Sequence, residues 1–367
     1  MKAIAIKPGK GEAHLLDVEE PSIMNSDDVK IEVIEVGICG TDREEAEGGR
    51  ADAPSGDKDL IIGHEMFGRV VDTGKSVRSV KKGDYGVFMV RRPCGHCYFC
   101  KNERSDLCST GEYTERGIKE NHGFQAEYVV DSEKYLIPVP AEISDIGVLT
   151  EPMSVVVKAI DEALLIQTSR FPGIDRHEWI KGKRALVAGL GPIGLLAAFV
   201  LKLRGAEIWG LDIVDESTAR PSILKQIGGK YINGKQTRTD KIDDNYGNMD
   251  FIFEATGIAE LGFQLMDALG INGIYVLTGI PSGERPVCIL GADLMQKMVL
   301  NNQIMLGSVN AGRNHYLQAV QELVNVKKKF GSIINSLITE RAGYSNFRNV
   351  LDLHSPDEIK AVVEWKR

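Results

Sequence analysis

Four cysteines occur at the spacing C-x2-C-x2-C-x7-C, as Cys94, Cys97, Cys100 and Cys108. Thiolates this close in sequence can converge on one ion, and four sulfurs at about 2.3 Å form a closed tetrahedral zinc site. Because such a site has no open coordination position, we expect this zinc to be structural and to fix the loop 94–108. Its binding free energy would be on the order of 10 kcal/mol. A disulfide-bonded or iron–sulfur arrangement is the alternative interpretation.

A second set of potential metal ligands is spread along the chain and consists of Cys39, the adjacent pair His64 and Glu65, and Glu151. One sulfur, one imidazole and exchangeable carboxylates leave a coordination position for water or a substrate oxygen, as in catalytic zinc sites. Taken singly, each residue has a structural explanation: a core cysteine, a hydrogen-bonded histidine, or an acidic residue at a helix start. Their combination favours a catalytic metal.

A nucleotide-binding motif follows a predicted buried strand and opens an apolar helix: Gly189, Leu190, Gly191, Pro192, Ile193 and Gly194. Its glycines permit a tight turn and close approach of a pyrophosphate, and the helix N-terminus offers free N–H groups. Asp212 ends the next predicted strand, where it would bind the adenine-ribose hydroxyls. A carboxylate there repels a 2′-phosphate, and Ile213 and Val214 supply no arginine, so we expect NAD to be preferred over NADP. The alternative is that Asp212 caps a turn.

The predicted elements that position these residues fall into two stretches. Up to about residue 150 short strands and turns dominate, whereas from residue 184 buried strands alternate with helices, which predicts an α/β fold with a parallel, doubly wound sheet. The strands expected in the first stretch are 29–36, 68–71, 85–90 and 125–130. Those expected later are 184–188, 207–211, 251–254, 274–278, 304–309 and 359–365, with helices near 152–163, 193–203 and 314–328.

Composition limits the function further. Acidic residues outnumber basic ones, 52 against 44, and the net charge of −8 argues against a nucleic-acid partner. We find no membrane span and no leader segment, so we expect a cytoplasmic protein with reduced thiols, which favours metal ligation by the clustered cysteines. Cys288 stands alone and is expected to be a small buried hydrophobe. At 367 residues, two domains are expected.

The pattern Gly63-His64-Glu65-x2-Gly68-x5-Gly74-x2-Val77 resembles the signature of the zinc-containing medium-chain alcohol dehydrogenase superfamily. The order of the motifs follows that superfamily along essentially the whole chain. The resemblance implies a GroES-like, β-rich catalytic domain from residues 1–180 and 309–367, with a Rossmann nucleotide-binding domain, residues 181–308, inserted between them.

Within the superfamily the chain is most similar to the archaeal glucose 1-dehydrogenases. The resembling segments are Ile38–Arg43, Arg91–Arg92, Glu112–Ile118, His122–Phe124, Ser308–Asn310 and Glu358–Lys360. What this implies is oxidation of an aldose, D-glucose and also D-galactose, at C1 to the lactone. The hydride would pass to NAD(P), and the enzyme would bind two zinc ions per chain. Family members are usually homotetramers and sometimes dimers.

The resemblance also implies residue roles. Cys39, His64, Glu65 and Glu151 would hold the catalytic zinc, a Lewis acid for the C1 hydroxyl. Thr41 would contact that hydroxyl and relay its proton, and Asp42 is a candidate partner of the His64 ring. The sugar would be bound by Glu115, Glu151 and Asn310, although Glu115 and Asn310 can equally be a surface acid and a turn residue. The cofactor would lie along Leu277, Thr278, Gly279, Ser308 and Val309.

Some positions depart from the family pattern. Glu44 replaces a relay histidine, while Val90 and Val155 replace an asparagine and an aspartate that contact the sugar in some relatives. These changes leave the substrate range open. A polyol dehydrogenase acting on sorbitol or xylitol is the closest alternative, because Leu149–Val155 also resembles those enzymes. An alternative from another class is a zinc-stabilised nucleotide-binding module without turnover, which would need no open metal site.

Overall fold

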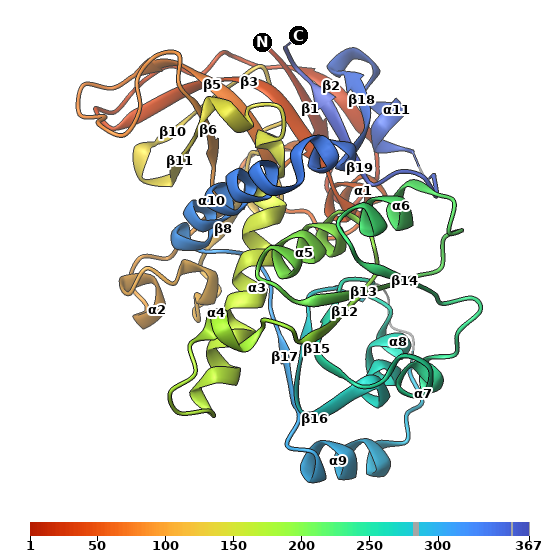
Figure 1. Cartoon of the computed structure of the whole chain (residues 1–367). Helices are drawn as coiled ribbons and strands as arrows, with labels where there is room; N and C mark the ends of the chain where they lie inside the picture. Colours follow the sequence, from red (N-terminus) through yellow and green to blue (C-terminus); the bar gives the residue numbers. More distant parts are fainter. Residues whose placement is uncertain (282–285, 354, 367) are drawn as a thin grey trace. The chain divides into compact units, whose positions relative to one another are not determined.

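The computed structural model describes residues 1–281, 286–353 and 355–366 and separates into two compact units. Unit 1 comprises Met1–Ser154, Ala311–Val324 and Asn335–Arg367, and unit 2 comprises Val155–Asn310 and Asn325–Ile334 (Figure 1). The predicted catalytic domain is 1–180 and 309–367, and the predicted nucleotide-binding domain is 181–308. The compact units differ from this division because residues 155–180, 309–310 and 325–334 belong to unit 2. That functional domain division stays a prediction.

Unit 1 is built on a seven-stranded sheet around the long strand β3 (Asp28–Ile38), which pairs with β5 (Glu65–Thr73), β10 (Tyr128–Ser132) and β19 (Lys360–Glu364). The β-branched residues of β3 suit a strand that is largely buried. The sheet is completed by β6 (Tyr85–Phe88), β11 (Leu136–Val139) and β18 (Ile338–Gly343). Two three-stranded sheets contain β1 (Lys2–Ile6), β2 (Ala13–Asp17) and β4 (Leu60–Ile61), and β7 (Arg91–Arg92), β8 (Thr114–Arg116) and β9 (Glu120–Asn121).

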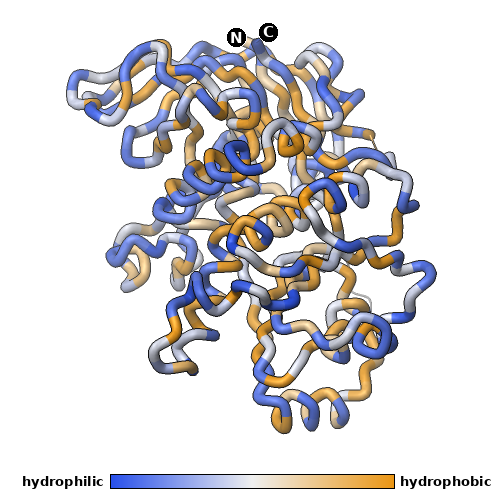
Figure 2. Tube along the Cα trace, viewed as in Figure 1, coloured by the Kyte–Doolittle hydropathy of each residue, from blue (hydrophilic) through white to orange (hydrophobic). Residues whose placement is uncertain are grey.

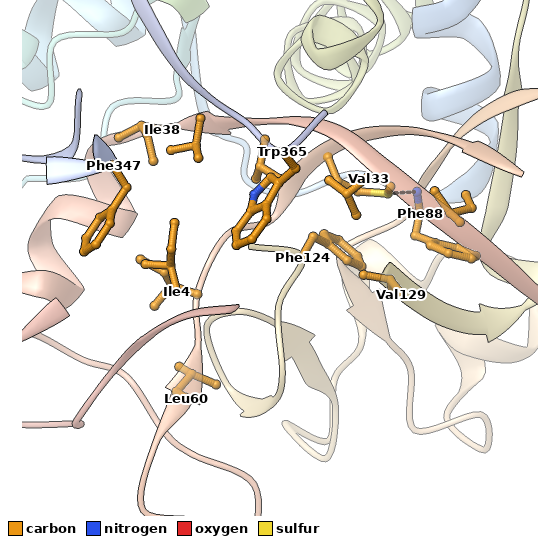
Figure 3. Packing of buried hydrophobic residues seen from close by; sticks show 14 of the residues in the cluster. Ile4, Val33, Ile38, Leu60, Phe88, Phe124, Val129, Phe347 and Trp365 are labelled. Carbon is orange, nitrogen blue, oxygen red and sulfur yellow. Dashed lines mark hydrogen bonds between the residues drawn. The ribbon is translucent and has the colours of Figure 1, made fainter. Parts of the chain in front are cut away.

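The core of unit 1 joins residues from both ends of the sequence. Figure 3 shows Ile4, Phe88 and Phe124 in one cluster with Phe347 and Trp365 from the C-terminal segment. The C-terminal strand β19 therefore has to pair with β3 before the seven-stranded sheet is complete. The helices of this unit are α1 (Gly40–Ala46), α2 (Tyr98–Lys101), α11 (Arg348–Leu351) and the first part of α10 (Arg313–Phe330).

Unit 2 contains a six-stranded parallel sheet in the order β14-β13-β12-β15-β16-β17. Its strands are β12 (Arg184–Ala188), β13 (Glu207–Asp212), β14 (Lys230–Asn233), β15 (Met249–Glu254), β16 (Leu269–Leu277) and β17 (Ile304–Gly307). Its helices are α3 (Thr150–Ser169, which starts in unit 1), α4 (Arg176–Trp179), α5 (Pro192–Leu203), α6 (Ala219–Gln226), α7 (Ile242–Tyr246), α8 (Ala259–Gln264) and α9 (Gly291–Leu300). Apolar segments follow the central strands and α5 in Figure 2, as burial on both faces of a parallel sheet requires.

The predicted strands and helices are confirmed, with shifts of a few residues at their ends. The α/β class and the doubly wound parallel sheet are also confirmed. The prediction for Cys288 is wrong, because this side chain is exposed. In the part of the chain that the structure describes, every helix is too short or too polar to cross a lipid bilayer.

Candidate active site

Cys39 lies directly after β3 and forms the N-cap of α1. Its Sγ accepts a hydrogen bond from the backbone N–H of Thr41 at 3.2 Å, and its own N–H donates to Oδ2 of Asp42 at 2.8 Å. This reciprocal capping satisfies donors at the helix start and fixes the direction of the thiol. Thr41 is half-buried in the first turn of the same helix, beside the sulfur.

The structure brings Cys39 together with His64 and Glu65. Sγ of Cys39 lies 3.1 Å from Nε2 of His64, and one ligand atom from each of the three residues lies within 4.8 Å of the others. His64 and Glu65 are buried at the start of β5, which pairs with the end of β3. A thiol, an imidazole and a carboxylate at this separation fit a zinc ion that keeps an open position.

Asp42 faces the other nitrogen of the His64 ring, with Oδ1 3.5 Å from Nδ1. Burial opposes the charge of this carboxylate, but His64, the N–H of Cys39 and the charge of Lys360 together outweigh burial and lower the pKa of Asp42. A charged acceptor beside Nδ1 favours the tautomer in which Nε2 is free to bind a metal. Asp42 thus orients both ligands, since its second oxygen caps Cys39.

Lys360, the first residue of β19, is a member of this site that the sequence analysis missed. Its fully buried Nζ forms an ion pair with Oε2 of Glu65 and donates to the carbonyl of Ile38 at 3.0 Å. Gly37 makes room for the pair, because a Cβ there would lie 2.1 Å from Glu65 Oε2. Burial lowers the pKa of Lys360, but Glu65, Cys39 and Asp42 together outweigh burial, so the pKa is raised and the amine stays charged. It offsets part of the negative charge of the ligand set.

Replacing Lys360 by methionine should lower the free energy of unfolding by about 3–5 kcal/mol, because Glu65 would be left as a buried charge without its counter-ion. The matched control is Lys366→Met, which removes a solvent-exposed ion pair with Glu32 and should cost less than about 1 kcal/mol. Denaturant unfolding of both proteins without the catalytic zinc, an ion that would itself neutralise Glu65, measures the two losses. Equal losses in the two variants would contradict the structural role of Lys360.

Glu151 lies in the first turn of α3 and is outside the group of three. Burial raises the pKa of Glu151 to about 7, and the charges of His64 and Glu65 also act on it. Its carboxylate therefore belongs to the surroundings of the cluster. The ligand role of Glu151 stays a prediction.

Glu45, on α1, is a second residue that the sequence analysis did not single out. It is 1% exposed, and neither carboxylate oxygen has a hydrogen-bond partner among the described residues. Burial, reinforced by the charge of Asp42, raises the pKa of Glu45 to about 9. A carboxyl group in this environment is held in its neutral form.

Glu45→Gln should therefore stabilise the protein increasingly as the pH rises. Between a pKa of 4.5 for the unfolded chain and about 9 for the folded one, the folded protein binds a proton that the unfolded chain releases, so wild-type stability falls with pH. The gain of the variant should be small at pH 5 and about 3 kcal/mol at pH 7. Denaturant midpoints at the two pH values test this. Glu44→Gln is the control, since Glu44 is exposed, and a pH-independent gain for Glu45→Gln would contradict the assignment.

The four-cysteine group also assembles. One ligand atom from each of Cys94, Cys97, Cys100 and Cys108 lies within 4.8 Å of the others. The backbone N–H of Cys100 donates a hydrogen bond to Sγ of Cys97. This bond lowers the pKa of Cys97 to about 6, which favours its thiolate form. Sγ of Cys97 is likewise the N-cap of the short helix α2. Four sulfurs without a carboxylate or a vacancy fit a structural zinc ion.

The residues predicted to bind the sugar have different surroundings. Glu115 on β8 accepts two hydrogen bonds from Arg91, at 3.0 and 2.9 Å, and the guanidinium of Arg91 lies 3.8 Å from the ring of Tyr113. Arg91 therefore fixes the orientation of the Glu115 carboxylate, and the sugar-binding role of Glu115 stays a prediction. Asn310 belongs to unit 2 and has a positive φ of 63°, as expected of a turn asparagine.

The predicted cofactor residues of unit 2 lie at the carboxyl edge of its sheet. Gly189 has a φ of 84°, and a Cβ on Gly194 would lie 1.7 Å from the carbonyl oxygen of Gly189, so only glycine permits this close contact of turn and helix. The remaining residues lie at the ends of neighbouring strands: Asp212 ends β13 and Ile213–Val214 follow it, Leu277 ends β16 and Thr278–Gly279 follow it, and Ser308–Val309 follow β17. This edge is where nucleotides bind in doubly wound sheets.

Comparisons with known proteins place the chain in a family. A model of the alcohol dehydrogenase GroES-like domain matches residues 25–141, and a model of the glucose dehydrogenase C-terminus matches residues 144–365. The chain belongs to the glucose dehydrogenase family. It is accordingly an NAD(P)-dependent zinc dehydrogenase with a GroES-like domain and a nucleotide-binding domain.

Similar proteins cover the whole chain. Glucose 1-dehydrogenase from Methanocella arvoryzae is 36% identical, and glucose 1-dehydrogenase 2 from Vulcanisaeta moutnovskia is 39% identical, each over 99% of both chains. Among solved structures, Haloferax mediterranei glucose dehydrogenase in complex with NADP, zinc and gluconolactone matches all of both chains, with a TM-score of 0.89 and 31% identity.

Proposed function

We propose a reaction for this chain and roles for its residues. The chain oxidises D-glucose at C1 to the lactone and transfers hydride to NAD(P). The observation that supports this most directly is the cluster of Cys39, His64 and Glu65 in a chain that matches glucose dehydrogenases from end to end. D-Galactose is a second candidate substrate, since Val90 and Val155 remove two sugar contacts that some relatives possess.

The residue types of the two sites fit a zinc ion and a nicotinamide cofactor. Cys39, His64, Glu65 and Glu151 would hold a zinc ion that would supply a Lewis acid for the C1 hydroxyl, and a bound nicotinamide would supply the hydride acceptor. Asp42 keeps the His64 ring in the metal-binding tautomer. Thr41 donates its backbone N–H to the Cys39 sulfur, and its hydroxyl would take the substrate proton and pass it toward solvent. Glu115, oriented by Arg91, and Asn310 bind sugar hydroxyls.

The cofactor residues act through backbone and side-chain hydrogen bonds. The free N–H groups at the start of α5 bind the pyrophosphate, and Asp212 accepts from the adenine ribose. Leu277–Gly279 and Ser308–Val309 line the nicotinamide half. Reduced thiols, which the zinc loop needs, support a cytoplasmic location.

We also propose that the protein is a homo-oligomer, as a tetramer or a dimer. Helix α9 exposes apolar side chains, among them Met295 at 68%, Val299 at 73% and Leu300 at 70%. Strand β17 is an edge strand of its sheet. An uncovered apolar helix next to an open edge favours association with a second copy. Light scattering of the wild-type chain and of Val299→Glu tests this, and a wild-type monomer would contradict it.

The substrate assignment is tested by following reduced nicotinamide with D-glucose, D-galactose and sorbitol, using NAD and NADP separately. We expect turnover of D-glucose and a kcat/KM for sorbitol that is lower by at least about tenfold, because a site built for buried polar contacts discriminates strongly. Preferred turnover of sorbitol would replace the aldose assignment with that of a polyol dehydrogenase. No turnover of any alcohol by the zinc-loaded protein would favour the nucleotide-binding module.

A further inference from the structure

Asp212 has a partner that the sequence does not reveal. Its Oδ2 accepts a hydrogen bond from the backbone N–H of Leu190 at 2.8 Å, and its Oδ1 accepts from the N–H of Ile213 at 2.6 Å. Nη1 of Arg220, in the first turn of α6, lies 3.6 Å from the same Oδ2. Arg220 follows Asp212 by eight residues, well beyond Ile213 and Val214, the positions directly after β13.

We propose that Arg220 is the residue that binds the 2′-phosphate of NADP, and that the Asp212–Arg220 pair lets one site accept both NAD and NADP. The inference deepens the proposed function and rests on its nucleotide site. The backbone hydrogen bonds to Leu190 and Ile213 hold Asp212 in place, where it accepts from the 2′-hydroxyl of NAD. Arg220 keeps 21% of its side chain exposed, so its guanidinium can contact a phosphate from solvent.

The charges around the pair set the balance between the two cofactors. A 2′-phosphate is repelled by Asp212 but attracted by the planar donor fork of Arg220, which suits phosphate oxygens. Two further acidic residues, Asp215 and Glu216, follow Asp212. Nζ of Lys225 lies 2.5 Å from Oε1 of Glu216 and offsets its charge, and Asp215 accepts a hydrogen bond from the backbone N–H of Ser217. A neutral pair therefore tolerates NADP while NAD is still preferred. Removing the Asp212 charge should shift the preference to NADP only while Arg220 is present.

Calorimetric binding of 2′,5′-ADP and 5′-ADP to the full chain tests this without turnover. Arg220→Gln should weaken 2′,5′-ADP by about tenfold or more and 5′-ADP by less than about threefold, because a hydrogen-bonded charge is lost for one ligand only. Asp212→Asn should strengthen 2′,5′-ADP by about tenfold, and Asp212→Asn/Arg220→Gln should lose that gain. Arg238→Gln, which removes an exposed arginine paired with Asp240, is the control and should change neither ligand.

Two outcomes would overturn the proposal. Equal weakening of both nucleotides by Arg220→Gln would mean that Arg220 only positions Asp212, and a gain that persists in the double variant would assign the phosphate to another group. Thermal unfolding of each variant shows whether it is folded. Should Arg220→Gln not fold, Arg220→Lys decides, since loss of the planar fork should weaken 2′,5′-ADP alone. If 5′-ADP binds but D-glucose is not oxidised, the proposed function fails, whereas the inference about Arg220 is still decided by the binding of 2′,5′-ADP.

Discussion

The Cys39→Ser variant is expected to lose at least about 10³-fold in kcat for D-glucose, because a Lewis acid contributes several kcal/mol to the barrier and the thiolate is one of its few ligands. The sulfur stands 3.1 Å from Nε2 of His64, and the N-cap hydrogen bonds that hold it can be kept by a serine hydroxyl. The fold should therefore survive, while the zinc content falls from two ions per chain to one.

Steady-state kinetics and elemental analysis of the same preparation measure these effects. Cys288→Ser is the matched control, since Cys288 is exposed and outside both cysteine-containing groups. It should keep full activity and both zinc ions. Full activity of Cys39→Ser would show that the catalytic metal is held elsewhere or is absent.

The second large effect is expected for Cys97→Ser, which should lower the free energy of unfolding by at least about 3 kcal/mol, part of a zinc-binding free energy of about 10–16 kcal/mol. Cys97 is the most buried of the four cysteines, and the backbone N–H of Cys100 lowers the pKa of its thiol, which favours the metal-binding thiolate. The loop 94–108 has little other regular structure, with only α2 and one short 3₁₀ turn, so the ion is its main source of order.

Denaturant unfolding and zinc analysis test this second prediction. Cys97→Ser should lose one zinc ion and much stability, whereas Cys39→Ser should lose one zinc ion and little stability. This contrast distinguishes the structural site from the catalytic one. A Cys97→Ser protein with two zinc ions and wild-type stability would contradict the structural role of the loop.

The features that were predictable from sequence are those set by local spacing. The four cysteines, the glycine turn and the strand–helix alternation each occupy short segments whose geometry follows from the residues themselves. Cys39 and the His64–Glu65 pair could be assigned to one metal site because the order of these motifs matches that of a known superfamily.

The features that were missed depend on contacts between distant segments. Lys360 reaches Glu65 only because β19 returns to pair with β3, and a terminal lysine carries no local signal of that. Arg220, on α6, approaches Asp212 at the end of β13 across the loop that joins the two elements. Glu45 resembles any exposed acid of an amphipathic helix until burial is known. The wrong expectation for Cys288 has the same origin, since residue type alone does not determine exposure.

The most direct test of a zinc-dependent glucose dehydrogenase is removal and restoration of the metal. The protein is treated with a chelator mild enough to spare the four-cysteine site, and reduced nicotinamide is followed with D-glucose and NAD before treatment, after treatment and after addition of zinc. We expect turnover before treatment, its loss together with one zinc ion per chain, and its return when zinc is restored. Turnover of D-glucose that persists after that ion has been removed would contradict the central claim.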